Sequence, residues 1–240
     1  MIEGEHIIVH KVEKSLAELV PAYCLLPLIS CFVWNTIVYN GTRLVTSDRP
    51  HYDMTTSFDR ATPVIPAFMI VYFGCFLFWG IFYIMCGRVS RQHCAKFVTF
   101  DILTRTVCGI IFLVMPTTNV RPLIEDSDVF SRILNFLYSI DAADNLFPSI
   151  HCLVSWNCFV GIRNVKIYSL RTRIIAFIGA ILVFISTLVT KQHVIADVIS
   201  AVVLSEIVWY IVNHTEFYKV TGRIFNRINT CIFRILKKNR

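Results

Sequence analysis

The chain has 240 residues with a formal net charge of +7, and 55% of its residues are apolar. Together with a mean hydropathy of +0.62, this composition excludes an ordinary soluble domain and indicates a membrane protein. The positive charge could suggest that the protein binds nucleic acid. Its distribution along the chain instead indicates how the protein is oriented in a membrane, so we expect no nucleic-acid partner. The nine cysteines show no paired CxxC spacing. We therefore expect neither a disulfide framework nor a bound metal, and no cofactor.

The apolar residues are grouped into runs that predict an all-α bundle of six membrane-spanning helices. Each run approaches the length of about 20 residues that crosses a hydrocarbon core of about 30 Å. The runs lie at residues 20–39, 64–86, 97–115, 147–162, 173–190 and 193–212, and a polar loop is expected at 40–63. The chain has no internal repeat, so residues 1–240 are interpreted as one membrane domain with a catalytic bundle at 20–212.

Three segments outside the predicted spans carry apolar residues at helical spacing among charged ones. Residues 1–19 predict an amphipathic lead-in helix, and residues 213–240 predict a basic amphipathic tail on the anionic inner leaflet. The longest loop, 116–146, predicts a helix that lies on the membrane. This loop is also the acidic part of the chain, and we expect it to shape lipid access or simply to be solvated.

The basic residues predict the orientation of the bundle. The two termini and the loops on their side hold 16 Lys and Arg, whereas the alternate loops hold 6. Positive residues favour the cytoplasmic side, so both termini are expected there. Arg121, Ser149, His151 and His193 then share the extracytoplasmic face, which predicts an outward-facing site in an integral protein of the plasma membrane.

Two of the apolar runs begin with residues that carry chemistry. Ser149 and His151 follow Pro148 at a predicted helix start, where free backbone N–H groups and the helix dipole favour an anion. Asp197 lies four residues after His193, on the same helix face, where it can fix the imidazole tautomer and raise its basicity. A hydrogen-bonded pair that merely stabilises a helix start is the alternative, at about even odds.

Arg121 follows the third run on the same predicted side. A guanidinium is the preferred group for binding phosphate, although most single loop arginines are solvated. With His193, His151 and Asp197, it completes a set of groups suited to covalent phosphoryl transfer without a metal: nucleophile, acid, orienting carboxylate and anion clamp. Lys191 is a further candidate for binding phosphate.

These motifs resemble those of the type-2 phosphatidic acid phosphatase superfamily, membrane lipid phosphatases and head-group transferases related to vanadium haloperoxidases. The family pattern is KxxxxxxRP, PSGH and SRxxxxxHxxxD. Arg121-Pro122, Pro148-Ser-Ile-His151 and His193-Val-Ile-Ala-Asp197 match its main positions in order. The resemblance covers about residues 114–197.

The resemblance implies a role for each matching residue. His193 would attack phosphorus to form a phosphohistidine, Asp197 would orient it, and His151 would protonate the leaving alkoxide. Ser149 and Arg121 would bind phosphate oxygens.

The chain departs from the family pattern at three positions. The family lysine falls on Val114, the family arginine of the third motif falls on Thr187, and the glycine of the second motif is Ile150. Two phosphate cations are thus missing. Lys191 and the Thr117-Thr118-Asn119 run are the candidate replacements.

Three functions remain open at this point. The favoured one is a phosphatase that hydrolyses a lipid phosphomonoester or pyrophosphate, such as a phosphatidate-like, isoprenyl-phosphate-like or sphingoid lipid. The same two cations are missing in the branch that resembles sphingomyelin and inositol phosphorylceramide synthases, so head-group transfer is the runner-up. A non-catalytic membrane scaffold that retains the fold is the alternative from another class.

One charged pair lies away from these motifs. Asp101 and Arg105 are four residues apart inside the third run. Arg105 is sixteen residues from Arg121, about 24 Å along a helix, which is too far to share a phosphate. We therefore expect an internal ion pair that holds spans together.

Overall fold

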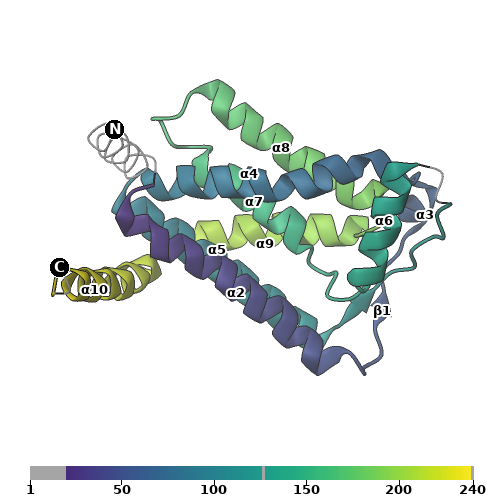
Figure 1. Ribbon diagram of the computed structural model, residues 1–240, viewed down its shortest axis with the longest axis horizontal. Coiled ribbons are helices and arrows are strands. Elements are labelled where there is room, and N and C mark those ends of the chain that lie inside the picture. Colours follow the sequence, from purple (N-terminus) through teal and green to yellow (C-terminus); the bar gives the residue numbers. More distant parts are fainter. Residues whose placement is uncertain (1–19, 126–127, 239–240) are drawn as a thin grey trace, which may run out of the picture.

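The computed structural model describes residues 20–125 and 128–238, and it is helical apart from one short two-stranded sheet (Figure 1). The helices are α2 (Ala22–Thr46), α3 (Ser57–Ala61), the 3-10 turn η1 (Pro66–Phe68), α4 (Met69–Arg88), α5 (Arg91–Val114), α6 (Val129–Ile140), α7 (Ile150–Ile162), α8 (Leu170–Val189), α9 (Ile195–His214) and α10 (Phe217–Lys238). Strands β1 (Tyr52–Asp53) and β2 (Thr117–Thr118) pair in parallel. The expected lead-in helix at 1–19 lies outside the described residues.

Five helices of the described part, α2, α4 (with η1), α5, α8 and α9, are long and apolar enough to cross a membrane. The chain is therefore an all-α membrane protein. The remaining predicted span is α7, which is apolar but has only 13 residues. At 1.5 Å per residue it measures about 20 Å, less than the hydrocarbon thickness. The segment that precedes α7 is not helical, and this segment lines the site described below.

The prediction of a loop from residue 40 was wrong for its first part, because α2 continues to Thr46. Gly41 does not end the helix. The hydroxyls of the buried Thr42 and Thr46 donate to helix carbonyls four residues earlier, at 2.7 and 3.0 Å. In the last turn, Arg43 pairs with Asp144 at 2.9 Å. Contacts with the rest of the fold thus keep this stretch helical, although its local composition favours a turn.

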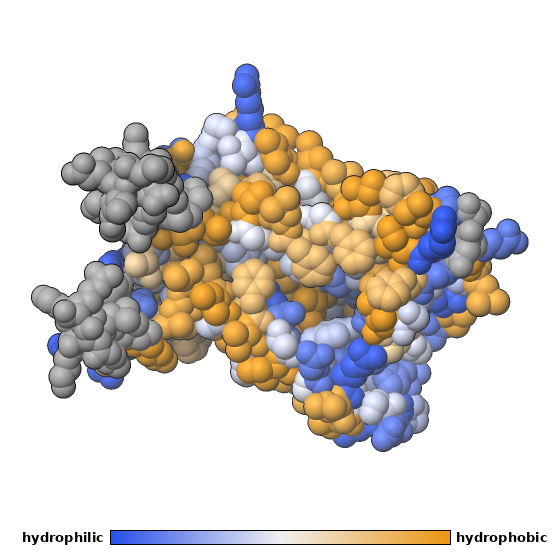
Figure 2. All heavy atoms as spheres, viewed as in Figure 1, coloured by the Kyte–Doolittle hydropathy of each residue, from blue (hydrophilic) through white to orange (hydrophobic). Residues whose placement is uncertain are grey.

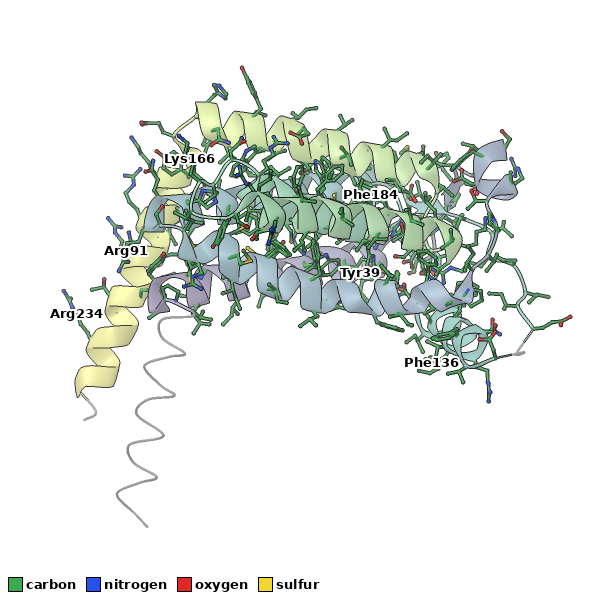
Figure 3. All side chains as sticks on the ribbon, turned by 90° about the horizontal axis from the view of Figure 1, so that it is seen from above. Tyr39, Arg91, Phe136, Lys166, Phe184 and Arg234 are labelled. Carbon is green, nitrogen blue, oxygen red and sulfur yellow. The ribbon has the colours of Figure 1, made fainter. Side chains whose placement is uncertain are left out.

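The two ends of the bundle differ in composition. The start of α2 and the whole of α10 lie at one end, while α3, β1 and α6 lie at the other (Figure 1). Arg91, Lys166 and Arg234 are labelled at the α10 end, opposite Phe136 of α6 (Figure 3). Figure 2 shows hydrophobic side chains over the middle of the visible face and hydrophilic ones gathered near β1 and α3. This distribution is that of a bundle whose middle faces lipid.

The expected helix within the acidic loop is confirmed as α6. Asp128 caps it by accepting the N–H groups of Phe130 and Ser131 at 2.7 and 3.1 Å. Leu134 and Leu137 are buried, and they form one cluster with the first residues of α4. The helix therefore crosses the end of the bundle with its apolar face against it (Figure 1).

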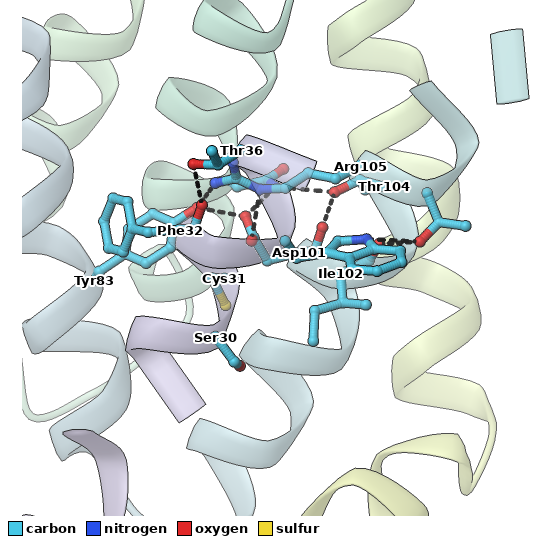
Figure 4. A network of polar contacts seen from close by, with 12 residues as sticks. Ser30, Cys31, Phe32, Thr36, Tyr83, Asp101, Ile102, Thr104 and Arg105 are labelled. Carbon is cyan, nitrogen blue, oxygen red and sulfur yellow. Dashed lines mark hydrogen bonds and ion pairs between the residues drawn. The ribbon is translucent and has the colours of Figure 1, made fainter. Parts of the chain in front are cut away.

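The expected internal ion pair is also confirmed, deep in the bundle (Figure 4). Arg105 Nε lies 2.7 Å from Asp101 Oδ2, and both side chains are at most 2% exposed. The hydroxyl of Tyr83, on α4, donates to Asp101 and lies 2.8 Å from Arg105 Nη2. Asn157, on α7, donates to Asp101 at 3.3 Å and accepts from Ser205 of α9 at 2.8 Å. The pair thus joins four helices, and its polar atoms are satisfied by neighbours.

Candidate functional site

His193 lies in the tight turn that connects α8 to α9. Its backbone N–H donates to the carbonyl of Thr187 at 3.1 Å. Its Nδ1 lies 3.1 Å from Asp197 Oδ2, and the same oxygen accepts the N–H of Val194 at 3.0 Å. The predicted imidazole–carboxylate pair is therefore present. In a neutral imidazole whose Nδ1 donates to Asp197, Nε2 carries a free lone pair and is chemically able to act as a nucleophile.

His151 lies in the first turn of α7, facing His193. The centroids of the two imidazole rings are 5.8 Å apart. The ring of Tyr72 lies 4.7 Å from that of His151, and the ring of Trp79 lies 5.6 Å from it. Trp79 is itself fixed by a 2.8 Å hydrogen bond from Nε1 to Ser155 Oγ on α7. Helix α4 thus holds His151 against the second imidazole.

The non-helical segment before α7 is fixed by hydrogen bonds to distant parts of the chain. Thr117 Oγ1, in β2, accepts the N–H groups of Leu146 and Phe147 at 3.2 and 2.9 Å. The N–H of Ser149 donates to the carbonyl of Asp197 at 3.2 Å. Irregular backbone is tolerated at membrane depth where protein groups satisfy it. These bonds bring the second and third sequence motifs together.

Arg121 reaches the same place from the segment between β2 and α6. Its Nη2 donates to Gln192 Oε1 at 2.9 Å, and its Nη1 donates to the carbonyl of Asp141. The guanidinium also lies over the ring of Tyr138, 4.9 Å from its centroid. Burial raises the pKa of Tyr138 to about 12, so this ring stays neutral beneath the cation.

The first of two cavities beside His193, called here the aromatic cavity, has a volume of about 260 Å³. Its lining includes both imidazoles, Arg121 and Gln192 on one side. Five aromatic side chains and a group of oxygen-bearing residues complete it: Tyr39, Tyr72, Phe73, Phe76, Trp79, Asn35, Asp141, Asp144 and Asn145, with Leu137, Leu146 and Ile150. Two imidazoles and a guanidinium thus share one largely apolar space.

The second cavity, called here the polar cavity, has a volume of about 450 Å³ and lies on the other side of His193. Asp53, Asp59, Arg60 and Lys191 are among its lining residues. Hydrogen bonds to Thr55 lower the pKa of Asp53, so this carboxyl stays ionised. His193 is therefore accessible from an aromatic side and from a hydrophilic side.

The structure brings His193, His151, Asp197 and Arg121 together but places the other two expected residues differently. Ser149 is fully buried, its hydroxyl accepts the N–H of Cys152 at 3.2 Å, and it lines neither cavity. In the structure, Ser149 is therefore the N-cap of α7. Lys191 lines only the polar cavity, where Nζ donates to the carbonyls of Asp59, in α3, and of Thr62, which follows it, at 2.5 Å each. Burial lowers the pKa of Lys191.

The two positions at which the family pattern has cations, Val114 and Thr187, differ in their exposure to the surroundings of the bundle. Val114, at the end of α5, is 78% exposed, whereas Thr187 is fully buried, with its hydroxyl 3.5 Å from Cys152 Sγ. Neither lines a cavity. In the part of the chain that the structure describes, no group of three or more His, Cys, Asp or Glu is arranged to hold a metal ion.

Sequence reasoning missed several residues of the aromatic cavity. Gln192 holds Arg121, and Asn35 and Tyr39 extend the lining from α2. The sequence did carry one signal for these residues. Asn35 and Tyr39 are four residues apart in an apolar run, which places two polar side chains on the same helix face. Nothing in the sequence pairs that face with a loop about 100 residues later.

A comparison of the chain with models of protein families, with curated proteins and with solved structures finds no match in any of the three. The function is therefore inferred from the geometry of the site.

Proposed function

We propose that this protein is a membrane lipid phosphatase that hydrolyses a lipid phosphomonoester or pyrophosphate through a phosphohistidine on His193. The observation that carries the proposal is the arrangement at the aromatic cavity: two imidazoles at 5.8 Å, one of them held by a buried carboxylate, beside a guanidinium. This set can attack, protonate and bind a phosphate group without a metal.

The reaction divides into two displacements. In the first, Nε2 of His193 attacks phosphorus and forms a P–N bond while the P–O bond to the lipid alkoxide breaks. Protonated His151 donates its proton to that alkoxide, and Asp197 stabilises the imidazolium through Nδ1. In the second, His151 takes a proton from water, the water oxygen bonds to phosphorus and the P–N bond breaks, which releases inorganic phosphate. Arg121 offsets the charge on the phosphate oxygens in both steps.

A lipid substrate is supported by the position of the aromatic cavity between helices. Its lining comes from both α2 and α4. The start of α2 and the end of α4 lie close together at the α10 end, and the two helices separate toward α6 (Figure 1). Phe73 and Phe76 line the cavity, yet 44% and 53% of their surface remains exposed on the bundle. An acyl chain can thus lie along these rings in the bilayer while its phosphate reaches the imidazoles.

Hydrolysis is supported by the polar cavity on the other side of His193. Its charged lining gives water a path to the phosphohistidine that does not cross the aromatic cavity. Head-group transfer uses the same first step and differs only in the acceptor. A lipid alcohol would have to approach through the aromatic cavity after the first alcohol leaves.

We further propose the topology that the basic residues indicate: six spans, with α7 as the short one, both termini in the cytoplasm, and the site open to the outer face of the plasma membrane. The labelled basic residues at the α10 end support this orientation (Figure 3).

The test is incubation of the full-length protein in detergent and EDTA with a panel of lipid phosphates, followed by assays for inorganic phosphate and for phosphoenzyme. We expect phosphate release by the wild type and neither signal from His193→Ala. The matched control is His214→Ala, since this exposed histidine near the end of α9 is remote from both cavities. Phosphate release by His193→Ala refutes the proposed nucleophile.

Two other results would replace the proposed function. Appearance of the phosphoryl head group on added diacylglycerol or ceramide, with no free phosphate, assigns a transferase. Absence of product from every lipid phosphate favours the non-catalytic scaffold.

A further inference from the structure

The candidate replacements for the missing phosphate cations do not line the aromatic cavity. Lys191 and Asn119 line only the polar cavity, where Asn119 Nδ2 donates to the carbonyl of Lys191 at 3.0 Å. The hydroxyl oxygen of Thr117 accepts two N–H groups of the segment before α7. Arg121 is thus the only arginine or lysine among the described residues that line the aromatic cavity. A phosphate there needs further donors.

The turn between α8 and α9 distributes three consecutive residues between the two cavities. Lys191 lines the polar cavity, Gln192 lines the aromatic cavity, and His193 lines both. Lys191 has a φ of 52°, in the left-handed region that side chains other than glycine rarely adopt. The backbone N–H groups of Gln192 and His193 both donate to the carbonyl of Thr187, at 2.9 and 3.1 Å. The turn therefore holds Gln192 next to the proposed nucleophile.

Gln192 carries a side-chain donor for which the protein supplies no acceptor. Its Oε1 accepts from Arg121 Nη2 at 2.9 Å. A guanidinium can only donate, so this bond fixes the amide with its oxygen toward Arg121 and leaves the nitrogen free. Gln192 is 2% exposed, and its buried Nε2 has no acceptor among the described residues. A buried donor without an acceptor is unfavourable, and an acceptor on a ligand removes that cost.

Arg121 carries a second donor of the same kind. Its Nη1 donates to the carbonyl of Asp141 and its Nη2 to Gln192, whereas its buried Nε has no acceptor in the part of the chain that the structure describes. Two unpartnered donors thus belong to two side chains joined by one hydrogen bond. The group that the proposed chemistry brings to His193 is a phosphate, whose several charged oxygens accept strong hydrogen bonds from both amide and guanidinium nitrogens.

We propose that Gln192 binds the phosphate of the substrate directly, with Nε2 as the donor, and so replaces part of the binding that the family pattern assigns to cations at Val114 and Thr187. This inference rests on the proposed function and adds a residue to its phosphate-binding group. One amide then serves two purposes, since its oxygen holds Arg121 while its nitrogen contacts the substrate. Donation from Arg121 to Oε1 polarises the amide and strengthens Nε2 as a donor.

A direct test on the wild-type protein is possible because the chain has only two glutamines, Gln92 and Gln192. The full-length protein in detergent is isotope-labelled at the glutamine side-chain nitrogen and titrated with hexylphosphonate, whose P–C bond the proposed reaction does not cleave. We expect the amide protons of Gln192 to move downfield in the NMR spectrum, because a hydrogen bond to a phosphonate oxygen deshields them.

Gln92 is the internal control for this titration. It is exposed on α5, its Nε2 donates to the hydroxyl of Tyr218 at 3.0 Å, and it lines neither cavity. The variant Gln92→Met assigns the two signals by removing one of them. A Gln192 signal that stays in place while hexylphosphonate saturates the thermal stabilisation of the protein overturns the inference. Absence of any stabilisation of the wild type by hexylphosphonate overturns it as well.

A double-mutant cycle separates direct contact from support of Arg121. Gln192→Met is close in volume and removes both the donor and the acceptor. It should raise the Kd for hexylphosphonate at least about tenfold, as for loss of a hydrogen bond to a charged group, whereas Gln92→Met should leave it unchanged. In the Arg121→Met background it should still raise the Kd at least about threefold. No effect in that background, with the variants folded, means that Gln192 acts only through Arg121 and overturns the inference.

Turnover measured beside binding separates this inference from the proposed function. Hydrolysis of a lipid phosphate by Gln192→Met with unchanged kcat/KM overturns the inference and leaves the phosphatase intact. A shift of the Gln192 signal by hexylphosphonate in a protein that hydrolyses no lipid phosphate supports the inference and refutes the phosphatase. The NMR titration uses the wild type, so it does not depend on the folding of any Gln192 variant.

Discussion

Asp197→Asn provides the sharpest test of the site, because the structure predicts a limited loss. Asp197 Oδ2 accepts two bonds, from His193 Nδ1 at 3.1 Å and from the N–H of Val194 at 3.0 Å. The backbone N–H can only donate, so the side-chain oxygen of an asparagine must occupy this position. The amide nitrogen then takes the place of Oδ1, away from the imidazole. The variant therefore keeps the tautomer of His193 and removes only the charge.

The magnitude follows from this geometry. A hydrogen bond to a charged group contributes about 1.5–3 kcal/mol and a neutral one about 0.5–1.5 kcal/mol, a difference of about 1–2 kcal/mol. Formation of the phosphohistidine should slow about five- to thirtyfold, at 1.36 kcal/mol per factor of ten. Asp197 Oδ1 has no partner in the described part of the chain. The buried amide nitrogen that replaces it should lower the free energy of unfolding by about 1–3 kcal/mol.

The assay is single-turnover formation of the phosphoenzyme, measured together with thermal unfolding in detergent. The matched control is Asp59→Asn. Asp59, in α3, is also a buried carboxylate, and it accepts the N–H of Ile195, the first residue of α9, at 2.7 Å. It does not contact His193, so its loss should change the rate by less than about fivefold, the effect of one charge at a helix N-terminus. A folded Asp197→Asn with an unchanged rate, or one slowed more than about a thousandfold, refutes the bonding described here.

Three further predictions test the site and the core. His151→Asn should slow turnover of an alkyl phosphate far more than that of an aryl phosphate, since a good leaving group needs no acid; parallel kinetics on the two substrates check this, and equal losses argue against His151 as the acid. Lys191→Met should lower the unfolding midpoint, since Nζ donates to the carbonyls of Asp59 and Thr62, at the end of α3, at 2.5 Å each. The burial that lowers the lysine pKa favours its neutral form. The cost of burying this charge is therefore full at neutral pH and disappears as pH rises through the folded pKa toward 10.5. The difference in stability between wild type and variant should thus vary with pH only in that alkaline window, and a change between pH 6 and 8 contradicts it. Asp101→Asn should destabilise the bundle by about 3–5 kcal/mol because it leaves Arg105 charged and unpaired, and Asp101→Asn with Arg105→Met should recover part of that loss in thermal unfolding.

Much of the fold followed from the sequence because each helix is a local feature. A run of apolar residues long enough to cross a bilayer is stable as a helix wherever it lies in the chain. Each of the six predicted runs contains a helix in the structure. The boundaries were less predictable. The polar composition of residues 40–63 predicted a loop, but burial of Thr42 and Thr46 extends α2 to Thr46. The short length of α7 also depends on the irregular segment held by Thr117.

The sequence by itself predicted the pairing of His193 with Asp197, because the two residues are only four positions apart. His193 lies in the turn before α9, so the contact is local to the start of that helix. Only the tertiary structure decided what surrounds them. The bonds that bring Arg121 to Gln192, and Asn145 to α2, join residues 71 and more than 100 positions apart. Such contacts depend on how helices pack and where loops fold back, and residue spacing carries no information about either. The same packing leaves Ser149 buried as a helix cap and leaves Gln192 Nε2 without an acceptor among the described residues.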